Sequence, residues 1–290
     1  MNIFTSRKDM LAQSSSWKEA GQSICLVPTM GNLHDGHLSL LEVAAANSDK
    51  VITSIFVNPL QFAPSEDFHK YPRTREADID KLASTGLCDT VFMPQRMYAD
   101  GYATEIVPSG VALRLEGTNR PHFFTGVATV VYQLFVQTDA DKAVFGEKDF
   151  QQLRVIQQMV HDLHIQTQII AAPTLREPDG LAMSSRNGYL NAIQRAQAPA
   201  LYQALQQAAD RLRAGGAVQA VLATAKDALN SAGFDSVDYF ELCDADNLAP
   251  ITQLKKREDQ AADNGASDSM AVLVVAANIG NVRLIDNLRV

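Results

Sequence analysis

The first 175 residues alternate between short apolar runs and segments of helical periodicity, and this alternation constrains the fold more than any other feature. The apolar runs lie at residues 24–27, 51–57, 90–93, 142–145 and 165–171, and we expect the first strand to end at Pro28. Apolar residues recur at helical spacing at 37–47, around 79–86, at 127–136 and at 150–163. Strands that alternate with helices are typical of βαβ units with a parallel sheet. We therefore predict an α/β fold for residues 1–175, with a Rossmann-like doubly wound parallel sheet.

The sequence changes in character after residue 191. Alanine-rich helical segments at 196–214 and 217–232 precede apolar runs at 237–243, 270–277 and 282–285, which we interpret as strands. The polar and charged residues 255–269 predict a loop between two of these strands. We expect a second, smaller α+β domain over residues 176–290 that acts as a lid.

Composition excludes several classes of protein. A hydrophobic fraction of 46% with 20% charged residues is that of a globular protein, and the net charge of −8 argues against a nucleic-acid binder. The longest apolar run, 271–277, is far shorter than the roughly 20 residues of a membrane helix. Residues 1–10 contain no apolar signal core, and the three cysteines lack metal-ligand spacing. We expect a cytoplasmic protein without nucleic-acid or membrane partners.

Four polar motifs each follow a predicted strand. They are PTMG at 28–31 leading into HDGH at 34–37, NPLQF at 58–62, GEKD at 146–149 and MSSR at 183–186. Loops at the carboxyl ends of parallel strands converge on one crevice, where ligands bind. Histidine, lysine, arginine, serine hydroxyls and backbone amides beside glycines would meet there. These groups suit a nucleoside triphosphate.

Each motif also has a structural interpretation. His34 and His37 are equally suited to capping a helix, and no zinc-spaced cluster accompanies them. Asp149 and Gln152 have the spacing of a capping box. Ser184 and Ser185 are common turn residues, whereas a glycine-bounded loop that carries Arg186 also suits a phosphate-binding lid.

The motifs together resemble the pantoate–β-alanine ligase (pantothenate synthetase) family of the nucleotidyltransferase superfamily. The segments that carry the resemblance cover most of residues 24–190 and are PTMGNLHDGH, SIFVNPLQF, YPRT, RLEGTNRP, VFGEKDFQQL and DGLAMSSRNGYL. VRLIDN at 282–287 is a weaker match. HDGH is similar to the superfamily's His-x-Gly-His signature, and MSSR to its second, mobile phosphate-binding loop. The resemblance implies an AMP-forming ligase of pantothenate biosynthesis, with ATP, Mg²⁺, pantoate and β-alanine as ligands and a homodimer as the assembly.

The resemblance also assigns residues. His37 would be the proton donor, with His34 beside it on the phosphates and with Lys148 and Arg186 as catalytic cations. Gln61 and Gln152 would bind pantoate, Gln61 also lying near β-alanine, and the neutral side chains of Asn58 and Tyr71 suit the same acid. No residue is assigned to a metal. The ATP-binding set would be Met30, Gly31, Asn32, Leu33, His34, Asp35, Gly36, His37, Gly146, Glu147, Lys148, Asp149, Leu175, Met183, Ser184, Ser185 and Arg186.

Two positions depart from the family pattern. His122-Phe123-Phe124 follows Arg120-Pro121 where Gly-His-Phe is usual, and Gln133 stands where a lysine is common. Two other functions also fit the motifs: a nucleotidyltransferase acting on another small acceptor, and a non-catalytic nucleotide-binding protein. Release of pyrophosphate and AMP, measured with pantoate and with or without β-alanine, distinguishes the three.

Overall fold

The computed structural model describes residues 1–63, 68–254 and 271–290. The chain divides into two units that are not contiguous in sequence. Unit 1 comprises Met1–Glu147 and Gln151–Leu175, and unit 2 comprises Lys148–Phe150 and Arg176–Val290. The loop predicted at 255–269 lies outside the described residues. In the described part of the chain, every helix falls short of the length and apolar character that crossing a membrane requires.

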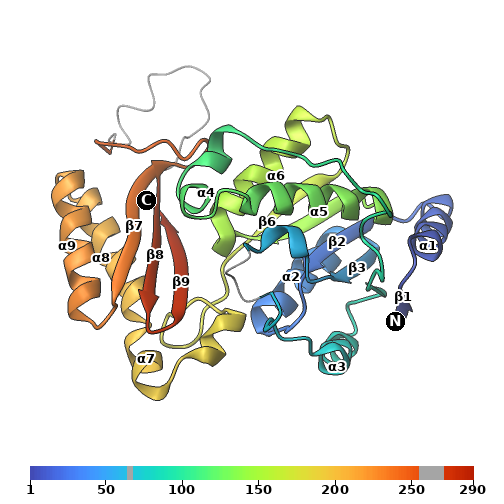
Figure 1. Cartoon of the computed structure of the whole chain (residues 1–290), viewed down its shortest axis with the longest axis horizontal. Coiled ribbons are helices and arrows are strands. Elements are labelled where there is room, and N and C mark those ends of the chain that lie inside the picture. The colour runs from blue at the N-terminus through green and yellow to red at the C-terminus, as the bar shows by residue number, and fades with distance from the viewer. Residues whose placement is uncertain (64–67, 255–270) are drawn as a thin grey trace. The chain divides into compact units, whose positions relative to one another are not determined.

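Unit 1 contains a six-stranded sheet in the order β1-β4-β3-β2-β5-β6 (Figure 1). Every described strand pair in it is parallel, which confirms the predicted Rossmann-like class. Chain order reverses between the neighbours β2 and β5, and ligands of such sheets bind outside the carboxyl ends of the strands at this reversal. The strands are β1 (Asn2–Phe4), β2 (Ile24–Thr29), β3 (Lys50–Ile55), β4 (Thr90–Phe92), β5 (Lys142–Gly146) and β6 (Gln168–Ala172).

Helices cover both faces of this sheet. In Figure 1, α5 and α6 lie on the opposite side of the strands from α2 and α3. Helix α2 packs on β2, β3 and β5, whereas α1 and α5 pack together and on β2. The helices are α1 (Arg7–Glu19), α2 (Asp35–Asn47), α3 (Arg75–Thr85), α4 (Glu116–Asn119), α5 (Phe123–Thr138) and α6 (Phe150–Asp162), with 3-10 turns η1 (Pro59–Gln61), η2 (Gly110–Leu113) and η3 (Glu147–Asp149).

The central strand β2 shows why the apolar runs were informative. Ile24, Cys25, Leu26 and Val27 are all fully buried, as expected for a parallel strand with helices on both faces. Burying each large aliphatic side chain contributes about 1.5–3 kcal/mol. The predicted strand end at Pro28 is wrong, because β2 continues to Thr29. Pro28 is tolerated because β2 pairs with β5 only at Cys25 and Leu26, so the missing N–H lies beyond that ladder.

Unit 2 contains a three-stranded antiparallel sheet in the order β7-β8-β9 with helices packed against it (Figure 1). This confirms the predicted smaller α+β fold. The predicted helix at 196–214 is interrupted, because Pro199 forms the N-cap of α8 and separates it from α7. The elements are η4 (Ser185–Tyr189), α7 (Ala192–Gln197), α8 (Ala200–Arg213), α9 (Val218–Ser231), β7 (Ser236–Asp244), β8 (Ala271–Ile279) and β9 (Val282–Arg289).

Candidate active site

The turn from β2 into α2 brings the two predicted catalytic histidines together. His34 is the extended N-cap residue of α2, and His37 lies in the first turn. The backbone N–H of His34 donates to Nδ1 of His37 at 3.3 Å, and the ring centroids are 4.1 Å apart. Both imidazoles therefore stand at the N-terminal end of a 13-residue helix, where the helix dipole favours anions.

The backbone amides of this turn are used differently from the prediction. Gly31 N–H donates to Thr29 Oγ1 at 3.2 Å, and the amides of Asn32 and Leu33 donate to the carboxylate of Asp78 at 2.9 and 2.8 Å. These three amides consequently face the protein. Across residues 1–63, 68–254 and 271–290, the amides of Asp35 and Gly36 donate to no protein group, as is usual in the first turn of a helix. The anion-binding capacity lies in that first turn and in the imidazoles.

The buried side chain of Asn58 holds the turn that follows β3 through several hydrogen bonds. Its side chain is 1% exposed, and Oδ1 accepts from the Tyr98 hydroxyl at 2.7 Å and from the Leu60 amide at 3.3 Å. Nδ2 donates to the Gly126 carbonyl at 3.0 Å and to Gln61 Oε1 at 3.2 Å. Asn58 therefore fixes Gln61, and its own polar atoms are occupied.

Gly126 and Tyr98 complete the support of this turn. A Cβ on Gly126 would lie 2.3 Å from the carbonyl oxygen of Leu60, so only glycine allows α5 to approach η1 so closely. Burial raises the pKa of Tyr98 well above its ordinary value, so the hydroxyl keeps its proton and remains a donor to Asn58.

The side chain of Gln61 links two of the predicted motifs. Its Nε2 lies 2.9 Å from Sδ of Met30, and its backbone carbonyl accepts from Arg120 Nη2 at 3.2 Å. Tyr71 is buried against Phe62, with ring centroids 5.9 Å apart, and Gln152 is half-buried on α6. Unit 1 thus brings Met30, Asn58 and Gln61 together.

Lys148 and Asp149 belong to unit 2, although Glu147, which directly follows β5, belongs to unit 1. The backbone carbonyl of Lys148 accepts from Nδ2 of Asn287 on β9 at 3.0 Å, and Lys148 Nζ lies 3.8 Å from Asp149 Oδ1. Asp149, whose spacing to Gln152 also suits a capping box, is the last residue of η3, which runs directly into α6.

The MSSR motif forms a defined turn in unit 2. Ser184 is the N-cap of η4, and its Oγ accepts from the Arg186 amide at 3.2 Å. Asn187 Nδ2 donates to Glu177 Oε1 at 2.8 Å and to the Ala182 carbonyl at 3.1 Å. In the part of the chain that the structure describes, the half-buried Arg186 forms no ion pair, so its guanidinium remains available to an anion.

Two arginines hold the segment that precedes this turn. Arg176 pairs with both oxygens of Asp286 at 2.6 and 2.9 Å and stacks on Tyr202 at 3.6 Å; the Asp286 side chain is only 1% exposed. Arg195 contacts both Glu177 and Asp179. The hydrogen bond from Arg195 lowers the pKa of Asp179 below its ordinary 3.8. These ion pairs connect the segment to β9 and α7.

The two departures from the family pattern have local roles. His122 is the exposed N-cap residue of α5, and its side chain makes no capping hydrogen bond. Gln133 Oε1 accepts from Gln137 Nε2 at 3.2 Å within the same helix.

Leu175, the last residue of unit 1, is 39% exposed.

Sequence reasoning missed two buried polar residues. One is Asp78, described above, and the other is Gln151, whose amide connects α6 to the RLEG segment. Gln151 Oε1 accepts from the Glu116 amide at 3.0 Å, and Nε2 donates to the carbonyls of Val111 and Arg114 at 2.7 Å each. Their burial could not be read from the sequence, because it depends on partners that are distant along the chain.

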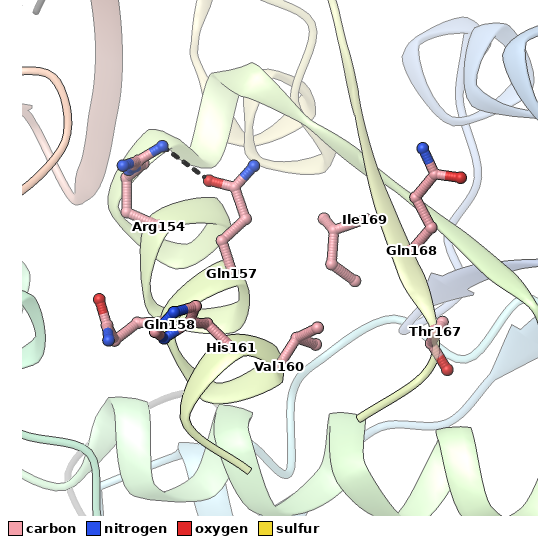
Figure 2. A pocket seen from close by; sticks show the side chains of 8 residues that line it. All are labelled: Arg154, Gln157, Gln158, Val160, His161, Thr167, Gln168 and Ile169. Carbon is pink, nitrogen blue, oxygen red and sulfur yellow. Dashed lines mark hydrogen bonds between the residues drawn. The ribbon is translucent and has the colours of Figure 1, made fainter. Parts of the chain in front are cut away.

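A cavity of about 420 Å³ lies elsewhere in unit 1, between α6 and the start of β6 (Figure 2). Arg154 and Gln157 point toward one another there, with Nη1 and Oε1 2.9 Å apart. None of its lining residues is a predicted site residue: Arg154, Gln157, Gln158, Val160, His161, Thr167, Gln168 and Ile169. Among the described residues, no group of three or more His, Cys, Asp or Glu side chains is placed to hold a metal ion.

Comparison with known proteins gives consistent matches over the full length. Residues 2–289 match the sequence profile of the family described as pantoate-beta-alanine ligase. The chain is 48% identical over 284 residues to the pantothenate synthetase of Caulobacter vibrioides, covering 97% of this chain and 96% of that protein. It is 51% identical over 271 residues to that of a Bradyrhizobium species, covering 92% and 91%.

Two crystal structures are similar over nearly all of both chains. Pantothenate synthetase from Thermus thermophilus superposes with a TM-score of 0.88 at 38% identity, covering 99% of each chain. Pantoate-beta-alanine ligase from Francisella tularensis, complexed with beta-gamma ATP and beta-alanine, gives 0.80 at 35% identity, covering 100% of this chain and 97% of that one.

Proposed function

The chain belongs to the pantoate-beta-alanine ligase family, and on that premise we propose how its residues share the reaction. It has pantothenate synthetase activity and condenses pantoate with β-alanine using ATP. A carboxylate is a poor acyl donor, because its leaving group would be an oxide. The chemistry therefore needs an activated acyl group, and ATP supplies the activation.

We propose that the reaction proceeds through pantoyl adenylate. The pantoate carboxylate attacks the α-phosphorus of ATP, a P–O bond forms, and the bond to pyrophosphate breaks. The free amine of β-alanine then attacks the acyl carbon of the mixed anhydride, loses a proton and expels AMP. No enzyme nucleophile takes part, which agrees with the burial of all three cysteines.

The observation that carries this proposal is the pair of imidazoles at the start of α2. Negative charge grows on the phosphate oxygens during adenylation, and donors placed in advance stabilise that charge. We propose that the N–H of the His37 ring donates a hydrogen bond to an oxygen of the α-phosphate and that His34 lies beside it on the phosphates. The backbone amides of Asp35 and Gly36, which donate to no other group among the described residues, add further donors in the same turn.

We propose that the remaining charges on the triphosphate are neutralised by Lys148, Arg186 and the hydroxyls of Ser184 and Ser185. The defined η4 turn and the absence of an ion pair on Arg186 among the described residues support this assignment. The rest of the predicted ATP-binding set, from Met30 to Gly36, Gly146, Glu147, Asp149, Leu175 and Met183, is proposed on family membership.

For pantoate we propose Gln61 and Gln152 as the contacting side chains, with Gln61 also near β-alanine. The buried network of Asn58 supports a positioning role for that residue, because its polar atoms are already used. Tyr71 is proposed to line the same pocket with its phenol.

We propose that Mg²⁺ enters bound to the triphosphate. Mg²⁺ in such sites is held by substrate phosphates with one or two carboxylates and not by an all-protein cage. The ion would supply charge neutralisation, and the residues named above would align the reacting groups.

We also propose a homodimer in the cytoplasm. Within the described residues, β6 pairs only with β5, and its sequence QIIAA has no charged residue to protect the outer edge. All three cysteines are buried and none forms a disulfide, which is typical of a reducing compartment. Sedimentation velocity tests the dimer, and Ala171→Lys on β6 distinguishes an interface at this edge from one elsewhere.

Pyrophosphate exchange tests the proposed reaction sequence. With pantoate and Mg²⁺ but no β-alanine, we expect radiolabelled pyrophosphate to enter ATP, and omission of pantoate should abolish this exchange. Exchange that requires β-alanine would contradict a separate adenylation step.

A further inference from the structure

Asp78 is a buried carboxylate on α3 that accepts hydrogen bonds from the backbone of the turn before His34. The residue is 1% exposed. Oδ1 accepts from the Leu33 amide at 2.8 Å, and Oδ2 accepts from the Asn32 amide at 2.9 Å and from Thr74 Oγ1 at 3.1 Å. Burying a carboxylate costs free energy unless hydrogen-bond donors surround it. Displacing the Asn32 or Leu33 amide would leave the buried Asp78 carboxylate without a donor, so both amides are held in place.

The backbone above Asp78 adopts a conformation that needs such support. Gly31 has φ of +82° and Asn32 has φ of +52°, two consecutive left-handed residues that connect β2 to α2. A Cβ on Gly31 would lie 2.9 Å from Asp78 Oδ2 and 3.1 Å from Ile55 Cγ2. The carboxylate therefore packs directly against the turn and leaves room only for glycine.

A second residue of the same helix holds the turn by its carbonyl. Lys81, one turn after Asp78, donates from Nζ to the backbone oxygen of Leu33. Leu33 is thus bound through both its N–H and its C=O, immediately before His34. The side chain of Leu33 is 1% exposed, which removes further freedom at this position.

We propose that Asp78 is a positioning residue for adenylation. It sets the direction in which the chain leaves β2, so that His34 forms the N-cap of α2 and His37 Nδ1 receives the His34 amide. The carboxylate also occupies the Asn32 and Leu33 amides, and phosphate contact is consequently left to the imidazoles and the first-turn amides. The proposal rests on the proposed roles of His34 and His37. A displacement of reacting groups by about 1 Å can cost roughly 100-fold in rate, so small losses of alignment here are measurable.

Asp78→Asn tests the proposal, because the amide keeps the shape but offers one acceptor oxygen instead of two. We expect kcat of pantoate-dependent pyrophosphate exchange to fall roughly 10- to 100-fold. KM for pantoate should change less than twofold, since Gln61 is held by a different network. Hydrogen exchange of the Asn32 and Leu33 amides should accelerate. Ser14→Ala is the matched control, because it removes a buried hydrogen bond to Thr138 far from this turn and should leave kcat unchanged.

Two milder variants keep the test decisive if Asp78→Asn does not fold. Thr74→Val removes one donor to Asp78, and Lys81→Met removes the donor to Leu33. Each should lower kcat, by less than Asp78→Asn does, and should affect the KM for pantoate less than kcat. A loss of melting temperature with normal kcat in these variants and normal amide exchange would overturn the proposal. If His37→Ala is impaired and Asp78→Asn is not, only the positioning role fails. Normal turnover in His37→Ala would instead refute the proposed histidine chemistry.

Discussion

His37 Nδ1 accepts the backbone N–H of His34 at 3.3 Å, and this contact determines how the ring can act. A nitrogen that accepts a hydrogen bond carries no proton, so the neutral ring must carry its proton on Nε2. Nε2 is the atom farther from the backbone, and a ring in this tautomer donates to a ligand without first being charged. The N-cap position of His34 thus sets the tautomer of its neighbour.

His37→Ala should lower kcat by about 10²–10³, the usual cost of losing one donor that stabilises charge in the transition state. KM should change much less, because the charge develops only as the α-phosphate is attacked. Single-turnover adenylation and melting temperature should be measured on the same preparation. His161→Ala, on α6 beside the cavity of Figure 2, is the control. Near-normal turnover with a lower melting temperature would assign His37 to helix capping alone.

Gln61→Ala should weaken pantoate binding by about 1–3 kcal/mol, the cost of leaving a buried polar group of the ligand unpaired. ATP binding should remain nearly unchanged, and titration calorimetry with each ligand measures both. Gln158→Ala, an exposed glutamine on α6, should affect neither. An equal loss of affinity for ATP would remove Gln61 from the acid pocket.

The strands and their polar loops could be predicted from the sequence because the determinants are local. β2, β3 and β5 are short apolar runs that end in polar motifs, and the parallel topology follows from their alternation with helices. The strand end at Pro28 was predicted wrongly, because whether a proline interrupts a ladder depends on how far the neighbouring strand extends. That extent is a tertiary property.

The support of the site could not be predicted, because it depends on contacts that are distant in sequence. Asp78 lies 46 residues from Asn32, and its place in READIDKL indicates only the polar start of a helix. Helix α1 was missed for another reason: it buries only Met10 and Ser14, too few apolar residues to produce a periodic pattern. That unit 2 closes as a lid stays a prediction.

Asn287→Ala should raise KM for ATP several-fold, because the Lys148 carbonyl loses the donor that holds it 3.0 Å away. The free energy of unfolding should fall by about 1–3 kcal/mol. Asn278→Ala removes hydrogen bonds to Ser236 and Asp238 at the exposed end of the same sheet and serves as the control. Steady-state kinetics measure the KM for ATP of both variants, and denaturant titration measures their free energy of unfolding. An unchanged KM for ATP in Asn287→Ala would show that the hydrogen bond from β9 does not contribute to the function of Lys148.

The cysteines should be unreactive in the folded protein. Burial raises the pKa of the Cys25 thiol to about 12 and also raises that of Cys88, and Cys243 is fully buried. Thiolate is the reactive form, so maleimide labelling should be slow until denaturant is added. Activity should persist after prolonged exposure to the reagent. Rapid loss of activity with one equivalent incorporated would indicate a thiol in the reaction.

The Asp179–Arg195 pair should stabilise unit 2 in a pH-dependent manner. The folded state lowers the pKa of Asp179, so its contribution is complete above the ordinary value of 3.8 and is lost as pH falls through the lower folded value. Asp179→Asn should therefore lower the free energy of unfolding at pH 7, by about 1 kcal/mol or less because the pair is so exposed. The difference in this free energy between the variant and the original chain should shrink below about pH 3.8. Urea unfolding across this range measures it. A difference that persists at the lowest pH would assign the effect to packing.

Unit 2 is assembled from two stretches of sequence, and this has a consequence for the order in which the protein is made. Asn287 and Lys148 are 139 residues apart, and the intervening chain includes α6 and β6 of the other unit. During synthesis, Lys148 leaves the ribosome long before the residue that fixes its carbonyl exists. The Lys148 carbonyl between β5 and α6 therefore gains its hydrogen bond only after β9 has been translated. A product that stops before β9 would contain Lys148 but lack Asn287, which donates this hydrogen bond. Such late, long-range closure is a slow step in folding.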